Sequence, residues 1–185
     1  MSHFEYVAVA FALLNALVVG RLLGGVGSVF DRSRRYWVHA AWVVTLVLVA
    51  ALQWWSFWGS RDVEWTPIRF LWVLSIPGLL FVAAGVLVGE APGSVASFRH
   101  HFFERRVPFF SLSMASAVII GLGPWILGQV PWFTSSPTHA VAVALMALSL
   151  AGLCLRTHTV HTALVGLGLL VAAAAFLVPV TSPAA

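Results

Sequence analysis

The sequence contains no lysine, so all ten of its basic residues are arginine. Without lysine, the chain forms neither a retinal Schiff base nor a pyridoxal phosphate aldimine, and it has no Walker-type phosphate-binding loop. The single cysteine, Cys154, excludes an internal disulfide, a covalent c-type haem and a cysteine-only iron–sulfur cluster. These absences remove several classes of cofactor protein at once.

Charged residues are also scarce. They make up 9% of the 185 residues, whereas hydrophobic residues make up 61%. A soluble domain is about one quarter charged, and a disordered chain needs low hydrophobicity. With a mean hydropathy of +0.96, this chain belongs to neither class. The composition predicts an all-α, polytopic integral membrane protein.

Charge-free runs locate the membrane spans, because a helix crosses the hydrocarbon core in about 20 residues. The longest run, 107–155, is divided by Gly128, Pro131 and Pro137, which are typical of loops. Residues 1–185 therefore form one transmembrane domain. We predict six spans at about 5–26, 36–58, 68–89, 107–128, 138–156 and 159–179.

The segment 94–106 lies between the third and fourth predicted spans. Its apolar residues Val95, Phe98 and Phe102 recur at helical spacing, away from three arginines. This pattern predicts a short interfacial helix on the membrane surface. The arginines that we expect to face lipid headgroups are Arg99, Arg105 and Arg106.

Arginine is unevenly distributed between the two predicted sides of the membrane. One side carries only Arg61 and Arg69, and the loops of the other side carry seven arginines. Because cytoplasmic loops are enriched in basic residues, we expect both termini to lie outside, in a bacterial inner membrane. The seven arginines are Arg32, Arg34, Arg35, Arg99, Arg105, Arg106 and Arg156.

Polar residues inside the predicted spans are the first candidates for a site, because an ionisable group in lipid is costly. Arg21 either snorkels to the interface or lines an inward cavity. Its candidate partners in such a cavity are His39, His161 and either Glu90 or Asp31. Arginines at such a mouth favour a small anion. The candidate binding or pore-lining residues are Asn15, Arg21, Arg34, Arg35, His39 and Gln53.

Histidines gather at the predicted inner face, where Cys154 also lies. Imidazole and thiolate groups at one depth could ligate Zn or Fe, and His39 facing His161 could hold one b-type haem. Alternatively, these histidines are amphipathic residues at a wet interface, and no cofactor is bound. The candidate metal ligands are His39, His100, His101, Cys154, His158 and His161.

Small residues recur every fourth position in two of the predicted helices. Such stripes let helix backbones approach closely in lipid, either within a chain or between subunits. They lead us to expect a homo-oligomer. The stripes are Ala16, Gly20 and Gly24, and Ser113, Ala117 and Gly121.

Several short motifs in the first 110 residues form a recognisable set. They are Arg21-Leu22-Leu23, Tyr36-Trp37-x-His39-x-x-Trp42, Gln53-Trp54-Trp55, Trp65-Thr66, Pro77, His101-Phe102-Phe103, Arg105-Arg106 and Phe109-Phe110. In these motifs the chain resembles a family of small multi-pass proteins of bacterial inner membranes whose activity is uncharacterised. The resemblance implies that the protein resides in a bacterial inner membrane, and it identifies no catalytic residues.

The sequence leaves three functions open. The first is a channel or transporter for a small solute or anion. The second is a metal- or haem-dependent oxidoreductase that uses the inner-face histidines, and the third is a non-catalytic subunit of a larger membrane complex. No serine-hydrolase elbow or H-E-x-x-H motif is present, so we predict no catalytic residues. The expected partners are membrane lipids, and we expect no nucleic acid, because the arginines flank apolar spans.

Overall fold

The structure, a computed structural model, describes residues 2–29, 31, 33–89, 95–132, 134 and 136–177. These residues contain six α-helices and one turn of 3-10 helix, with no strand among them. All six α-helices are long and apolar enough to cross a membrane, which confirms the prediction of an all-helical chain with six helices able to span one. The elements are α1 (His3–Val29), α2 (Trp37–Phe57), η1 (Trp58–Ser60), α3 (Pro67–Val88), α4 (Phe98–Ile126), α5 (Pro137–Cys154) and α6 (His158–Phe176).

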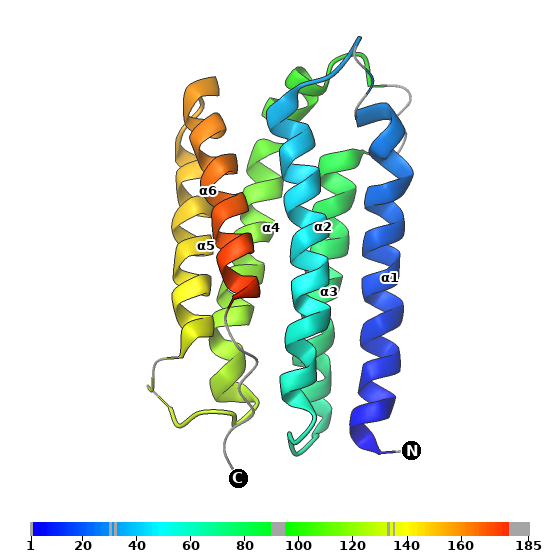
Figure 1. Cartoon of the computed structure of the whole chain (residues 1–185), viewed down its shortest axis with the longest axis vertical. Helices are drawn as coiled ribbons and strands as arrows, with labels where there is room; N and C mark the ends of the chain where they lie inside the picture. The colour runs from blue at the N-terminus through cyan, green and yellow to red at the C-terminus, as the bar shows by residue number, and fades with distance from the viewer. Residues whose placement is uncertain are drawn as a thin grey trace.

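Consecutive helices run in alternating directions, so α1 begins and α6 ends toward the same end of the bundle (Figure 1). α1 packs against α2 and α3, α4 packs against α3 and α5, and α6 packs against α2 and α5. The odd-numbered helices end where the even-numbered helices begin. We call this the arginine-rich end, because the described residues there include Arg34, Arg35, Arg99, Arg105, Arg106 and Arg156. Arg32 lies outside the described residues.

Short polar residues begin several of the helices. The Thr66 side chain accepts a hydrogen bond from the backbone N–H of Arg69, and Pro67 takes the first helical position of α3. The Ser97 side chain likewise accepts from the backbone N–H of His100 at the start of α4. Such side chains satisfy backbone donors that the first turn leaves without partners.

The separate interfacial helix expected in segment 94–106 is not confirmed. α4 begins at Phe98 and continues without a break to Ile126. Its 29 residues form one helix that is longer than a membrane span requires. Phe98, Phe102 and Arg106 follow one another at four-residue spacing and are all buried. This stripe packs into the bundle and continues the inward face of the following span. The expectation that Arg106 faces lipid headgroups is therefore wrong, since only 4% of the residue is exposed.

The two small-residue stripes have different surroundings. A Cβ on Gly121 of α4 would lie 3.1 Å from the Cβ of Ala142, so this stripe joins α4 to α5 within the chain. By contrast, Gly20 and Gly24 of α1 are exposed, and a Cβ on either would meet no atom within 4 Å. The close contact of α1 is made by Gly25 against Val88 instead. The homo-oligomer stays a prediction.

Candidate functional site

Side chains from three helices meet the end of α3. The last carbonyl groups of a helix have no partner within it. His39 of α2 and His101 of α4 both place Nε2 against the carbonyl oxygen of Leu87, at 2.8 and 3.0 Å. Arg21 of α1 donates from Nη2 to the carbonyl oxygen of Gly89 at 3.3 Å. Arg21 therefore acts as a cap on α3, and its predicted partner Glu90 lies outside the described residues.

The end of α5 repeats this arrangement. Arg106 of α4 donates from Nη1 to the carbonyl oxygen of Leu155, and His161 of α6 places Nε2 3.1 Å from the same oxygen. Positive or polar donors at a helix C-terminus also interact favourably with its dipole. At both helix ends, two side chains from neighbouring helices thus share one carbonyl oxygen.

The positions of His39 and His161 determine their tautomers. A carbonyl oxygen has no hydrogen to give, so Nε2 of each ring carries the hydrogen. Each Nδ1 is buried without a hydrogen-bond partner, and both residues are 0% exposed. Aromatic rings surround them: His39 stacks on Phe98 with centroids 4.8 Å apart, and the ring of Phe102 contacts both histidines.

The remaining candidate metal ligands are dispersed. His100 pairs with Glu104 at 3.0 Å on an exposed face of α4. Nδ1 of His158 lies 2.8 Å from the hydroxyl of Tyr36, and Cys154 is exposed. Among the residues that the structure describes, no group of three or more His, Cys, Asp or Glu side chains is placed to hold a metal ion. The Zn, Fe and haem assignments stay predictions.

The candidate pore-lining residues do not converge on one cavity either. Asn15 of α1 donates to the carbonyl oxygen of Ala50 of α2 at 3.2 Å, which makes it an interhelical contact. Arg34 forms an ion pair with Asp31 at 2.8 Å. Hydrogen bonds from the backbone and hydroxyl of Ser33, together with one from Arg34, lower the pKa of the Asp31 carboxyl to about 2. Of the six candidates, only Gln53 lines the central cavity described next.

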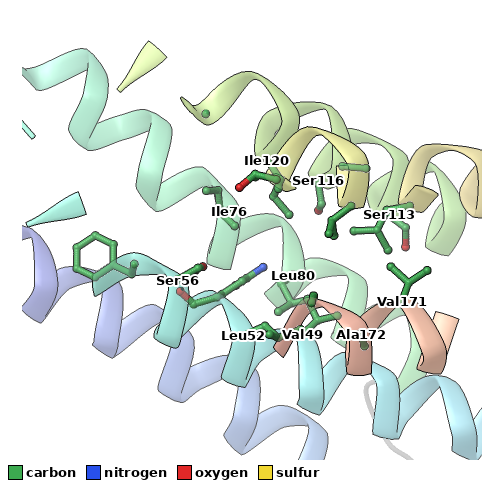
Figure 2. Close-up of a pocket in the computed structure, with 18 of the residues that line it drawn as sticks. Val49, Leu52, Ser56, Ile76, Leu80, Ser113, Ser116, Ile120, Val171 and Ala172 are labelled. Carbon is green, nitrogen blue, oxygen red and sulfur yellow. Dashed lines mark hydrogen bonds between the residues drawn. The ribbon is translucent and has the colours of Figure 1, made fainter. Parts of the chain in front are cut away.

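A central cavity of about 430 Å³ lies mainly among α2, α3, α4, α5 and α6, and Phe11 of α1 also lines it. Side chains from four of these helices point into it (Figure 2). None of the described residues that line it is charged or a histidine. Its polar lining residues are Thr45, Gln53, Ser56, Ser60, Ser113, Ser116, Gln129, Ser136, Thr138 and Ser149.

Gln53 is the most unusual residue of the cavity wall. Only 7% of it is exposed, and neither its Oε1 nor its Nε2 has a hydrogen-bond partner. Most buried polar side-chain atoms in proteins have at least one partner. An amide offers two donors and an acceptor. The side chain therefore keeps both kinds of hydrogen-bonding group unused at the cavity wall, where they are buried from water.

The two ends of the cavity differ. Toward the arginine-rich end it reaches Trp42, whose ring contacts Phe109 and Phe110 edge-on with centroids 5.5 and 5.4 Å away. At the opposite end it reaches the connections between helices, where Gln129 donates to the carbonyl oxygen of Gly59 at 3.1 Å. Aromatic rings thus lie at the arginine-rich end, and polar side chains such as Ser60 and Gln129 are among those that line the other.

Most of the cavity wall was not identified from the sequence. Every face of these helices is apolar, so hydropathy does not distinguish the inward face from the lipid-facing one. The available signal was the set of hydroxyl residues in mid-span, such as Ser113, Ser116 and Ser149. Comparisons with models of protein families, with curated proteins and with solved structures gave no match.

Proposed function

We propose that this chain is an integral membrane protein of the channel or transporter type, which takes a small, uncharged and mainly apolar solute into the central cavity. The observation that carries the proposal is the unpartnered amide of Gln53 in a cavity without charged lining residues. A buried polar group without a partner costs about 1–3 kcal/mol, and a solute with a hydroxyl or carbonyl group removes that cost. The volume lies within the range of about 300–1,000 Å³ that is typical of small-molecule sites.

An uncharged solute is favoured over an anion by the positions of the cations. Arg21 caps α3 and Arg34 pairs with Asp31, and neither lines the cavity. An anion in an apolar cavity would lose its hydration without gaining a counter-charge. The anion part of the sequence-based prediction therefore has no support in the cavity.

The test uses two photoreactive eight-carbon probes that differ only in a terminal hydroxyl or carboxylate. In lipid nanodiscs, we expect the alcohol to label peptides that line the cavity and the carboxylate to label them far less. Gln53→Leu should weaken labelling by the alcohol about two- to twelvefold, because one neutral hydrogen bond contributes about 0.5–1.5 kcal/mol.

A matched pair of variants on α6 controls for labelling from the lipid. Ala172 lies in the cavity wall and is 4% exposed, whereas the adjacent Ala173 is exposed on the outside of the bundle. Ala172→Phe should abolish cavity labelling and slow the flux of small uncharged solutes into proteoliposomes, and Ala173→Phe should do neither. Equal labelling by both probes, or equal effects of both variants, contradicts the proposal.

We further propose that the protein resides in a bacterial cytoplasmic membrane with its arginine-rich end toward the cytoplasm. An excess of arginine in short loops marks the cytoplasmic side of such proteins. Because the described residues form an even number of candidate spans, both termini would lie on the opposite side.

A further inference from the structure

A second pocket, of about 300 Å³, lies at the arginine-rich end. It shares no lining residue with the central cavity. We call it the arginine pocket, and its lining residues are Arg35, Tyr36, Trp37, Arg99 and His158.

The arginine pocket gathers the beginnings of three helices. Trp37 is the first residue of α2, Arg99 the second of α4 and His158 the first of α6. The N-terminal end of a helix carries a partial positive charge. At α2 and α6, no side chain caps the first backbone N–H groups. The helices therefore add to the positive potential that the two arginines produce.

The two arginines of the pocket differ from their neighbour Arg34 in their surroundings. Among the described residues, no ion pair involves Arg35 or Arg99, and both side chains are exposed. Their neighbour Arg34, in contrast, is paired with Asp31. The guanidinium group is planar and presents its donors in a fork that matches phosphate oxygens. Two such groups at one pocket are suited to an anion with several oxygens.

Tyr36 and His158 form the wall between the arginines and the bundle. The Tyr36 hydroxyl lies 2.8 Å from Nδ1 of His158. Burial raises the pKa of the Tyr36 phenol, against a smaller opposite effect of Arg99, so the hydroxyl keeps its proton. When this hydroxyl donates to Nδ1, the hydrogen of His158 lies on Nε2 and is free to donate to a ligand.

We propose that the arginine pocket binds a phosphate group, and that the phosphate belongs to the headgroup of an anionic membrane lipid. The end of the bundle at which the pocket lies carries most of the arginines, as expected for a surface against anionic lipid. The indole of Trp37, 48% exposed at the pocket rim, belongs to the residue type that favours the headgroup level. This site is separate from the proposed solute cavity and does not depend on it.

The experiment measures lipid binding to the full-length protein in an uncharged detergent. The probes are phosphatidylglycerol and phosphatidylcholine with eight-carbon chains, and inorganic phosphate. Native mass spectrometry counts the bound molecules, and a titration gives the affinity. We expect phosphatidylglycerol to bind more tightly than phosphatidylcholine, whose positive charge the arginines repel. Arg35→Gln combined with Arg99→Gln should weaken this binding about tenfold or more, since hydrogen bonds between charged groups are among the strongest.

The matched control is Arg105→Gln, which removes an exposed arginine of α4 outside the pocket. It should leave the affinity for phosphatidylglycerol within about twofold. If it weakens binding as much as the double variant does, the lipid responds to surface charge in general and the site is overturned. Replacement of both pocket arginines by lysine, which keeps the charge, should restore part of the affinity. If inorganic phosphate binds as tightly as the lipid, with the same dependence on Arg35 and Arg99, the phosphate site stands and its lipid source is refuted.

Discussion

His39 donates the Nε2 hydrogen to the carbonyl oxygen of Leu87 across 2.8 Å, and this bond joins the start of α2 to the end of α3. A fully buried histidine in an apolar chain invites a metal-binding or haem-binding interpretation. Here Nε2 is engaged with the backbone and the ring stacks on Phe98, and among the residues that the structure describes His39 belongs to no group of three metal-binding side chains. The geometry supports a role in holding helices together.

The shared acceptor at Leu87 makes the effects of His39 and His101 interdependent. His39→Phe or His101→Phe alone leaves the carbonyl oxygen with one donor, and each should lower the free energy of unfolding by about 1 kcal/mol. The double variant removes both side-chain donors and should lose more than the sum of the single effects by about 1 kcal/mol. Denaturant unfolding in mixed micelles measures this, with His100→Phe on the exposed face of α4 as the control. Strict additivity would contradict the shared bond.

The unpartnered amide of Gln53 should lower the unfolding free energy of the unliganded protein, although it contributes to binding of the proposed solute. Gln53→Leu removes two amide atoms that have no partner, so we expect the unliganded protein to gain about 1–2 kcal/mol in unfolding free energy. Thermal unfolding without added probe measures this gain. Addition of the photoreactive alcohol should stabilise the natural protein more than the variant. A loss of stability in Gln53→Leu would show that the amide has partners in the unliganded protein.

Gly152 of α5 allows the ring of Phe110 of α4 to approach the helix backbone. A Cβ at position 152 would lie 2.5 Å from two ring carbons, and an aromatic ring in a packed interface has little freedom to move. Gly152→Ala should therefore destabilise the protein by about 1–3 kcal/mol. Gly166→Ala on α6 is the matched control, since a Cβ there meets no atom within 4 Å and alanine favours helix. Similar unfolding temperatures for the two variants would refute the tight contact.

Asp31 should stay ionised in unusually acidic conditions, because its pKa in the folded protein is lowered to about 2. A lowered pKa means that the carboxylate stabilises the fold fully above pH 3.8, its ordinary value, and that this contribution is lost as the pH falls through about 2. The chain has two aspartates, so ¹³C-carboxyl labelling gives two resonances, which Asp62→Asn assigns. Ser33→Ala removes one hydrogen bond and should raise the midpoint of Asp31. An unchanged midpoint would argue against the Ser33 contact.

The single cysteine provides a direct test of orientation. Cys154 is exposed at the last residue of α5, at the arginine-rich end. In intact bacterial cells, a membrane-impermeant maleimide should not label it, and labelling should appear once the inner membrane is permeabilised. Cys154→Ser with Thr134→Cys moves the thiol to the opposite end and should reverse the pattern. Labelling of Cys154 in intact cells would invert the proposed topology.

Much of the fold was predictable, because spans depend on a local property. A run of apolar residues long enough to cross lipid is visible along the chain, and all six predicted spans correspond to helices. The main difference is the start of α4, where the arginines suggested a surface segment. The buried Phe98 and Phe102 show that the apolar face of this segment packs on other helices. Packing of this kind depends on distant residues.

The candidate sites were predictable only in part. Gln53 was identified because an amide is conspicuous in an apolar span, and the structure places it in the cavity wall. The histidines were identified by type, but their acceptors are the backbone carbonyl oxygens of Leu87 and Leu155. Every residue has such a carbonyl, so side-chain chemistry alone does not reveal which one is used.

The caps on α3 and α5 have a consequence for the order of assembly in the membrane. The chain is synthesised from its N-terminus, so His39 precedes Leu87, whereas His101 follows it by 14 residues. The end of α3 therefore gains its second donor only after the first turn of α4 has left the ribosome. The two donors to the carbonyl oxygen of Leu155 likewise lie on either side of it in the sequence. Arg106 precedes Leu155, and His161 follows it by six residues. The ends of α3 and α5 thus each wait for a donor from the helix that follows them in the chain.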